Sequence, residues 1–222
     1  MANASTKYRI AINGYGRIGQ CVLRALVERQ HPELEVVAIN ELSDLATITY
    51  LTRYDTTHGR FPGEVDNDGS ALLVNGQRIH VLCERDPQAL PWGELDIDLV
   101  LECSGSFKDR ATAEQHLTAG AKRLLFSQPA ENDVDATIVW GINEHELAPT
   151  QRILSAASCT TNCLVPLLTV LDEALGLEHG VTTTIHSAMN DQPVIDAYHQ
   201  TDLRLTRSAM QSIVPVDTGL AV

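Results

Sequence analysis

The chain has 222 residues, of which 44% are hydrophobic and 5% aromatic, and its formal net charge is −13 at pH 7. At about 100–200 residues per domain, this length holds one domain and part of a second. The acidic charge, with no long run of lysine or arginine, argues against nucleic acid and against an anionic membrane as partners.

The first predicted elements form one unit. A buried strand over residues 8–13 leads into a glycine turn over 14–19, a helix over 20–29 and a second strand over 34–40. Elements in this order form a βαβ unit with parallel strands and a right-handed crossover. The pattern predicts an α/β fold with a doubly wound, mostly parallel sheet of the Rossmann type.

Further elements follow along the chain. A helix over 43–54 precedes two short strands that the turn Asn75-Gly76 joins as a hairpin, and a later helix ends at Gly120. The expected ranges are 71–75 and 78–82 for the hairpin, 97–101, 123–127 and 136–140 for later strands, and 109–119 for the later helix.

A second domain is expected to begin near Ser155. An apolar helix over 164–175 tolerates Pro166 if the proline lies in its opening turn. A β-branched strand over 181–186, a long loop over 190–208 and a strand over 213–216 follow. We expect a cofactor-binding Rossmann domain at 1–155 and the first, incomplete part of an α+β catalytic domain at 156–222.

The glycine turn has the spacing Gly14-x-Gly16-x-x-Gly19 at the start of a helix. The first glycine permits the tight turn, the second lets the backbone approach a pyrophosphate, and the third lets the helix pack close to the strand. Glu41 ends the second strand, where a carboxylate can bind both ribose hydroxyls and would repel a 2′-phosphate, so NAD is favoured over NADP. The alternatives are that the glycines form a purely structural turn and that Glu41 is a solvated acid at the end of a strand.

Cys159 is the candidate nucleophile because it lies at or next to the start of a helix, where the dipole and backbone N–H groups favour the thiolate. His186 is the candidate base that pairs with it, although a histidine on a strand is more often structural. A zinc site of Cys159, Cys163, His179 and His186 is the alternative, and we expect no metal because no C-x-x-C spacing is present. Cys163 is expected to be a buried apolar residue.

Three segments carry a recognisable pattern: Ala11-Ile-Asn-Gly-Tyr-Gly-Arg-Ile-Gly19, Ala156-Ala-Ser-Cys-Thr-Thr-Asn-Cys163 and Thr183-Thr-Ile-His186. With these segments the chain, from about Tyr8 to Val222, resembles the glyceraldehyde-3-phosphate dehydrogenase superfamily. The motif around Cys159 is highly specific for it.

Other segments are similar to the branch of that superfamily that acts on erythrose 4-phosphate. They are Ile39-Asn-Glu-Leu42, His186-Ser-Ala-Met-Asn-Asp-Gln192 and Pro215-Val-Asp-Thr218. The glyceraldehyde branch usually has Asp at the position of Glu41 and Thr at that of Met189.

The resemblance implies an NAD-dependent oxidation of D-erythrose 4-phosphate to 4-phosphoerythronate, an early intermediate towards pyridoxal 5′-phosphate. Cys159 would attack the aldehyde to give a thiohemiacetal, His186 would accept the proton, and water would release the product from a thioester. One alternative is a phosphorylating glyceraldehyde-3-phosphate dehydrogenase that uses inorganic phosphate. Another is a non-catalytic nucleotide-binding fragment.

The resemblance also implies roles for individual residues. Leu205 stands where the family has a phosphate-binding arginine, with Arg204 before it and Arg207 after it, so substrate affinity is expected to be impaired or rearranged. The expected cofactor contacts beyond the glycine turn are Arg17, Ile18, Arg85 and Ser127, and the expected substrate contacts are Ser158, Thr160, Arg204, Thr218 and Gly219.

The resemblance implies a homotetramer when the protein is full length, with the loop after Asn190 at a subunit contact, and the sequence features below predict a cytosolic location. Five cysteines without a paired spacing are expected to be thiols in a reducing compartment. Neither a secretory signal nor an apolar run of about 20 residues is present. Family members continue past the position of Val222, so we expect the 222-residue chain to bind NAD weakly and to turn over slowly.

Overall fold

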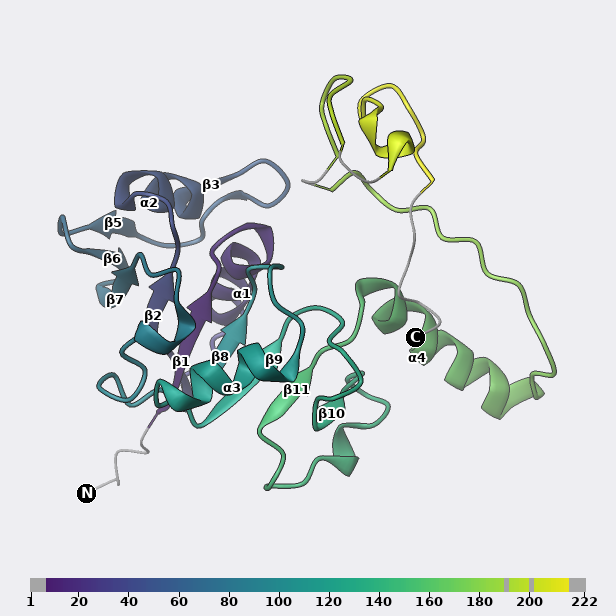
Figure 1. Cartoon of the computed structure of the whole chain (residues 1–222), viewed down its shortest axis with the longest axis horizontal. Coiled ribbons are helices and arrows are strands. Elements are labelled where there is room, and N and C mark those ends of the chain that lie inside the picture. Colours follow the sequence, from purple (N-terminus) through teal and green to yellow (C-terminus); the bar gives the residue numbers. More distant parts are fainter. Residues whose placement is uncertain (1–6, 190–191, 200–201, 216–222) are drawn as a thin grey trace. The chain divides into compact units, whose positions relative to one another are not determined.

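The computed structural model describes residues 7–189, 192–199 and 202–215 (Figure 1). The chain divides into two compact units, Met1–Ala157 and Ser158–Val222. The first unit holds a large sheet with helices, and the second holds one long helix followed by irregular segments. The expected assignment of domains at 1–155 and 156–222 stays a prediction.

The first unit is built around a nine-stranded sheet with the order β10-β11-β9-β8-β1-β2-β7-β6-β5. Pairing is parallel from β10 to β7 and antiparallel among β7, β6 and β5. The doubly wound, mostly parallel sheet is confirmed. The bounds are β1 Tyr8–Asn13, β2 Leu34–Asn40, β5 Val65–Asn67, β6 Ala71–Val74, β7 Gln77–Leu82, β8 Leu99–Glu102, β9 Arg123–Phe126, β10 Ala136–Thr137 and β11 Ile153–Ser155.

Strand β1 lies inside the sheet, with β2 on one side and β8 on the other, so the winding direction of the chain reverses there. Doubly wound sheets bind ligands at such a switch point, beyond the carboxyl ends of the strands. Asn13, the last residue of β1, is paired in register with Asn40 on β2 and with Glu102 on β8. Three polar residues therefore lie side by side where a ligand site is expected.

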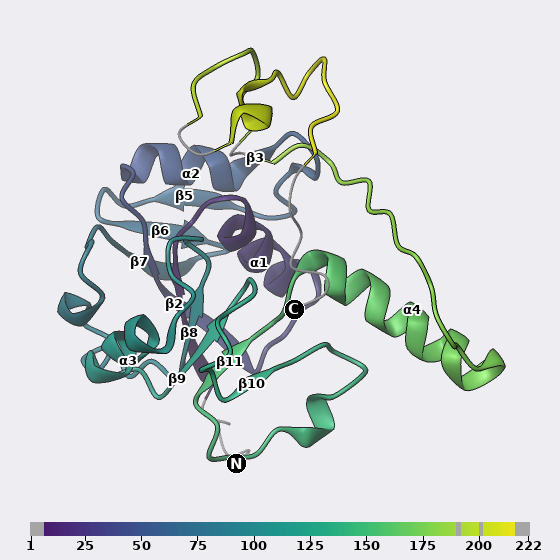
Figure 2. The same cartoon turned by 45° about the vertical axis from the view of Figure 1, so that its right-hand side comes forward.

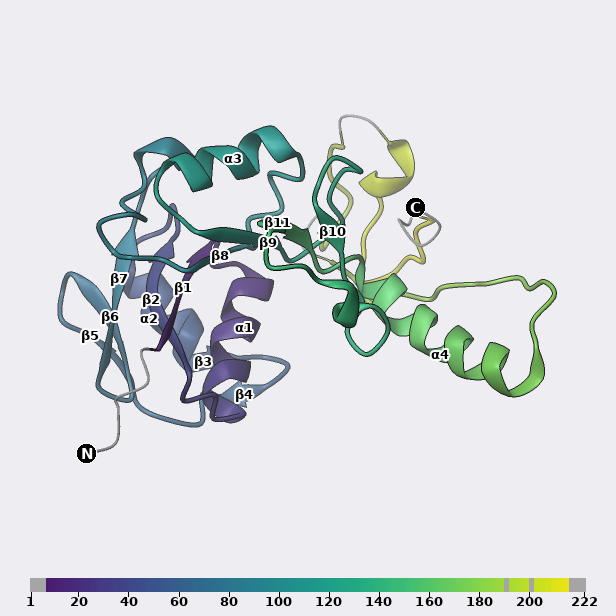
Figure 3. The same cartoon turned by 90° about the horizontal axis from the view of Figure 1, so that it is seen from below.

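Helices cover both faces of this sheet. Figure 3 shows α3 (Arg110–Thr118) on one face and α1 (Arg17–Glu28) on the other, and α2 (Leu45–Arg53) packs on the same face as α1. Successive strand residues point to opposite faces, so Ala11 joins the core under α3 while Ile12 joins the core under α1. Burial on both faces explains why the strands are continuous apolar runs.

The predicted hairpin is confirmed, because β6 and β7 pair with Val74 opposite Gln77. Asn75 and Gly76 have φ angles of 50° and 77°, as a two-residue turn of this kind requires. A second, unpredicted hairpin joins β3 (Tyr54–Asp55) to β4 (Gly59–Arg60). Short 3-10 helices lie at Pro87–Ala89 and Glu144–Glu146.

The second unit begins with α4 (Cys159–Leu175), which Figure 2 shows as one continuous helix followed by an extended segment. The helix begins five residues earlier than predicted, because Ser158 caps it, so Pro166 lies inside the helix and not in its opening turn. The prediction of a strand over 181–186 is wrong. In the described part of this unit no neighbouring strand is present to pair with these β-branched residues, and an isolated strand is not stable.

Two further ranges differ from prediction. The strand expected over 136–140 is limited to Ala136–Thr137, and residues 213–215 form no strand. A short 3-10 helix, Leu203–Thr206, interrupts the loop expected over 190–208. Among the described residues, no helix has both the length and the apolar character needed to cross a bilayer.

Candidate functional site

A pocket of about 370 Å³ lies in the first unit, among residues at and beyond the carboxyl ends of β1, β2 and β8. This volume is within the range of small-molecule sites, about 300–1,000 Å³. Four of the predicted cofactor-binding residues line it, namely Gly14, Gly16, Glu41 and Arg85.

The glycine turn has the backbone geometry that its spacing predicts. Gly14 has a φ of 87°, and a Cβ there would lie 2.4 Å from the Cα of Ser104. A Cβ on Gly19 would lie 2.3 Å from the carbonyl oxygen of Gly14, so this glycine allows the helix to pack against the turn. A Cβ on Gly16 would meet no atom within 4 Å.

These features fit the diphosphate of a dinucleotide. Gly16 lines the pocket and is the N-cap of α1, and no side chain caps the helix there. The first N–H groups of a helix carry a partial positive charge and bind phosphate. The open space at Gly16 lets a phosphate approach the backbone without meeting a side chain.

Glu41 connects the end of β2 to the glycine turn. Its Oε2 accepts a hydrogen bond from the backbone N–H of Tyr15 at 2.7 Å, and its Oε1 accepts one from Leu42 at 2.7 Å. A carboxylate has about four acceptor positions. Glu41 can therefore hold the turn in place and still accept hydrogen bonds from ligand hydroxyls.

Four predicted cofactor residues are not part of the pocket lining: Gly19, Arg17, Ile18 and Ser127. Arg17 forms an ion pair with Asp55 at the end of β3. The hydrogen bond from Arg17 holds the pKa of Asp55 well below its ordinary value, and the same bond raises the pKa of Arg17. Ile18 is half exposed, and the backbone N–H of Ser127 donates to the backbone carbonyl oxygen of Glu102.

In the second unit, the start of α4 places Cys159 next to His186. Ser158 caps the helix through its Oγ, which accepts from the N–H of Thr161 at 2.9 Å, so Cys159 is the first helical residue. The Sγ of Cys159 lies 3.4 Å from the Nε2 of His186. The predicted pair of thiol and imidazole is thus in direct contact.

A second hydrogen bond orients the imidazole of His186. Its Nδ1 lies 2.7 Å from the backbone carbonyl oxygen of Ser187. A carbonyl can only accept, so Nδ1 carries the proton in the neutral ring, and Nε2 presents its lone pair to Cys159. This tautomer is the one that can take a proton from the thiol.

The predicted substrate residues are found in different settings. The hydroxyl oxygens of Ser158 and Thr160, the two chain neighbours of Cys159, lie 2.9 Å apart and share a hydrogen bond. Arg204 is held by Asp202, with an ion pair of 2.6 Å. Thr218 and Gly219 lie outside the described residues.

The prediction that Cys163 is buried is wrong, because α4 has no buried residue and Cys163 is exposed. In the described part of its unit no element covers this side of the helix. Cys83 is also exposed, because β7 ends one residue before it. Within the described ranges no group of three or more His, Cys, Asp or Glu side chains could hold a metal ion.

Sequence reasoning did not identify Asn13, Asn40 and Ser104, which also line the pocket. A signal was present, because Asn13 and Asn40 each end a strand whose preceding residues are mainly apolar. Glu102 is another such residue, since it ends the run Leu99-Val-Leu-Glu102 and is fully buried. A polar residue at the carboxyl end of a parallel strand is a site candidate.

Both units match known protein families. Residues 8–110 match the family model described as the NAD-binding domain of glyceraldehyde 3-phosphate dehydrogenase. Residues 158–222 match the model described as the C-terminal domain of glyceraldehyde 3-phosphate dehydrogenase. The first match contains all of the residues that line the pocket, and the second contains the pair of Cys159 and His186.

Proposed function

Because the chain belongs to the glyceraldehyde 3-phosphate dehydrogenase family and carries its NAD-binding domain, we propose that it oxidises D-erythrose 4-phosphate to 4-phosphoerythronate through a covalent intermediate on Cys159. The observation that carries this proposal is the 3.4 Å contact between Cys159 Sγ and His186 Nε2 at the start of α4. A thiol beside an imidazole and a helix N-terminus is a suitable nucleophile for an aldehyde.

His186 moves the protons of the proposed reaction. Its Nε2 first takes the proton of the Cys159 thiol, the sulfur bonds to the aldehyde carbon, and Nε2 then returns this proton to the former carbonyl oxygen to give a thiohemiacetal. Nε2 next accepts the proton of the thiohemiacetal hydroxyl as the C–H bond breaks and a thioester forms. Water then cleaves the thioester, which releases 4-phosphoerythronate and restores the thiol.

When bound, NAD supplies the acceptor for the hydride that leaves the thiohemiacetal. Gly14, Gly16 and the N-terminus of α1 would hold its diphosphate, and Arg85 at the pocket wall would add a positive charge. Glu41 would accept hydrogen bonds from the ribose hydroxyls and repel a 2′-phosphate, which favours NAD over NADP. In this proposal Arg17 reaches a phosphate only by giving up its ion pair with Asp55.

The substrate would be held near the sulfur by hydroxyl and cationic groups. Ser158 and Thr160 lie on either side of Cys159 and would donate to substrate oxygens. Arg204 would bind the phosphate, in competition with Asp202. We assign Thr218 and Gly219 to the same substrate set on the family resemblance alone.

The four-carbon substrate is supported by sequence features in both units. Glu41 follows Ile39 and Asn40 in the arrangement of the erythrose 4-phosphate branch, and Met189 stands where the glyceraldehyde branch usually has Thr. In the erythrose-4-phosphate dehydrogenases, water and not inorganic phosphate is the acyl acceptor. On this basis we also propose a role on the route to pyridoxal 5′-phosphate, in the cytosol, and a homotetrameric assembly.

The substrate assignment is tested by measuring NADH formation with D-erythrose 4-phosphate and with glyceraldehyde 3-phosphate, each with and without inorganic phosphate. The expected result is a higher kcat/KM for the four-carbon aldehyde and no requirement for phosphate. A preference for the three-carbon aldehyde together with dependence on phosphate contradicts it, and identifies a phosphorylating glyceraldehyde-3-phosphate dehydrogenase instead. This second candidate agrees with the glyceraldehyde 3-phosphate dehydrogenase family to which both matches belong.

A further inference from the structure

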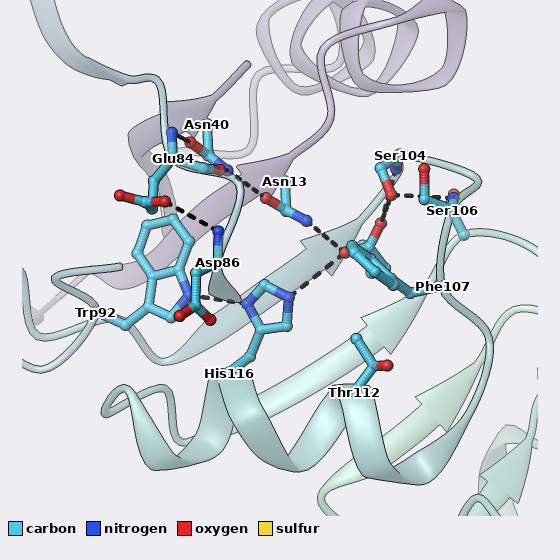
Figure 4. Close-up of polar contacts among 12 residues, drawn as sticks. Asn13, Asn40, Glu84, Asp86, Trp92, Ser104, Ser106, Phe107, Thr112 and His116 are labelled. Carbon is cyan, nitrogen blue, oxygen red and sulfur yellow. Dashed lines mark hydrogen bonds and ion pairs between the residues drawn. The ribbon is translucent and has the colours of Figure 1, made fainter. Parts of the chain in front are cut away.

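A chain of buried polar side chains runs from beneath α3 to the pocket (Figure 4). Trp92, His116 and Glu102 are completely buried. The indole Nε1 of Trp92 donates to His116 Nδ1 at 3.0 Å, and His116 Nε2 lies 3.5 Å from Glu102 Oε2. Asn13 Nδ2 donates to the same Glu102 oxygen at 2.5 Å, and Asn40 Nδ2 donates to Asn13 Oδ1 at 2.7 Å.

One end of this chain is fixed by the backbone of Glu84. Its N–H donates to Asn40 Oδ1 at 2.9 Å, and its carbonyl oxygen accepts from Asn40 Nδ2 at 2.8 Å. These two bonds decide which atom of the Asn40 amide is oxygen and which is nitrogen. Asn40 must then donate to Asn13, and Asn13 must turn its own N–H groups towards Glu102.

The other end is fixed by Trp92, because an indole N–H can only donate. His116 Nδ1 must therefore accept, and the proton of the neutral ring lies on Nε2, which faces Glu102. Among the described residues, His116 Nε2 has no hydrogen bond that meets ordinary geometry, so its approach to Glu102 at 3.5 Å is a long contact. On the side of Glu102 that faces His116, the neighbouring group is therefore an N–H and not an acceptor.

The second oxygen of Glu102 meets donors as well. Its Oε1 accepts from the backbone N–H of Ser104 at 2.8 Å and from the Ser104 hydroxyl. That hydroxyl accepts in turn from the N–H of Ser106 at 3.1 Å, which leaves its proton for Glu102. Every group around Glu102 is a donor, so both of its oxygens must be acceptors, which is the property of a carboxylate.

These bonds join Glu102 to Asn13 and Ser104, which lie next to Gly14 in the chain and in space, respectively. Asn13 precedes Gly14 in the chain, and Ser104 is the residue whose Cα a Cβ on Gly14 would meet at 2.4 Å. We propose that Glu102 is a positioning residue for NAD, because its carboxylate fixes Asn13 and Ser104 and thereby sets the backbone of the glycine turn. The proposal rests on the NAD-binding role of this pocket.

Glu102→Gln is the variant that tests it, because glutamine has almost the same shape but only one acceptor oxygen. In either orientation its amide N–H faces the donors of Asn13 and His116 or those of Ser104. A buried donor without an acceptor is destabilising, so a turn that shifts to relieve this conflict is expected to bind NAD about tenfold more weakly. The matched control is Glu94→Gln, which makes the same change of charge at an exposed position.

Titration calorimetry with NAD on the 222-residue chain and both variants gives the first readout. The expected result is wild-type affinity for E94Q and about tenfold weaker binding for E102Q. Equal affinity of E102Q and the wild type overturns the positioning role alone. A wild-type chain that binds no NAD, while NMR shows it to be folded, overturns the proposed function of the pocket as well.

The second readout is the tautomer of His116, measured from the ¹⁵N chemical shifts of its imidazole in the unaltered protein. A neutral ring with its proton on Nε2 is expected. A proton on Nδ1, or on both nitrogens, contradicts the arrangement of donors on which the role of Glu102 depends. This measurement tests the arrangement of donors around Glu102 even if E102Q does not fold.

Discussion

Iodoacetamide is expected to alkylate Cys159 about ten times faster than Cys163, because the thiolate is the reactive form and only Cys159 has an imidazole base in contact with its sulfur. Both cysteines are exposed and lie four residues apart on α4, so access is matched. Only Cys159 is placed at the first position of the helix with the imidazole of His186 at 3.4 Å. The measurement is peptide mass spectrometry of samples quenched at successive times.

Substitution of His186 distinguishes the contribution of the imidazole to the reactivity of Cys159 from that of the helix N-terminus. In His186→Phe, the rate at Cys159 is expected to fall towards that at Cys163, and an unchanged ratio would show that His186 does not activate the thiol. Cys103 reports whether the first unit is folded. Burial raises the pKa of its thiol to about 12, so it should remain unlabelled at neutral pH until the protein unfolds.

Gly14→Ala is expected to abolish measurable NAD binding and to lower the free energy of unfolding by about 2 kcal/mol or more. Two physical effects combine at this position. A residue with a side chain rarely adopts a φ of 87°, and the new Cβ would meet the backbone of Ser104 at 2.4 Å. The backbone of the turn must then move, and with it the N–H groups that would hold the diphosphate.

Gly69→Ala is the matched control for this prediction. Gly69 has nearly the same φ, 86°, but a Cβ there meets no atom within 4 Å. The Gly69→Ala variant should lose only the part of the free energy of unfolding that comes from the strained φ angle, about 1 kcal/mol. It should bind NAD with unchanged affinity. Calorimetry measures NAD binding and chemical unfolding measures stability. Equal losses of NAD binding in Gly14→Ala and Gly69→Ala would refute the idea that the contact with Ser104 sets the turn.

The fold of the first unit could be predicted because its signals are local. The apolar runs that become β1 and β2, the glycine spacing between them and the turn Asn75-Gly76 each act over a few residues. The signal for the start of α4 is also local, since Ser158 is a favourable N-cap and Thr161 supplies the N–H that it accepts. The prediction that Cys159 lies at or next to a helix start is confirmed. The predicted apolar range begins five residues late, at Leu164, because the apolar pattern begins only there.

Other features depend on residues far apart in the sequence. Arg17 was expected to meet a phosphate, but it pairs with Asp55, which only the β3–β4 hairpin brings close. Glu102 looks like an ordinary acid at a strand end until Asn13 and His116 are placed against it. The strand over 181–186 fails for the opposite reason, because its composition is favourable and its partner is missing among the described residues.

The proposed covalent step is tested most directly by mixing the chain with NAD and D-erythrose 4-phosphate, quenching in acid, and identifying the modified peptide by mass spectrometry. The expected result is a 4-phosphoerythronyl thioester on Cys159, with NADH formed in step with it and neither product in Cys159→Ser. NADH formation that persists in Cys159→Ser, or acylation at another residue, would contradict the assignment of Cys159 as the nucleophile.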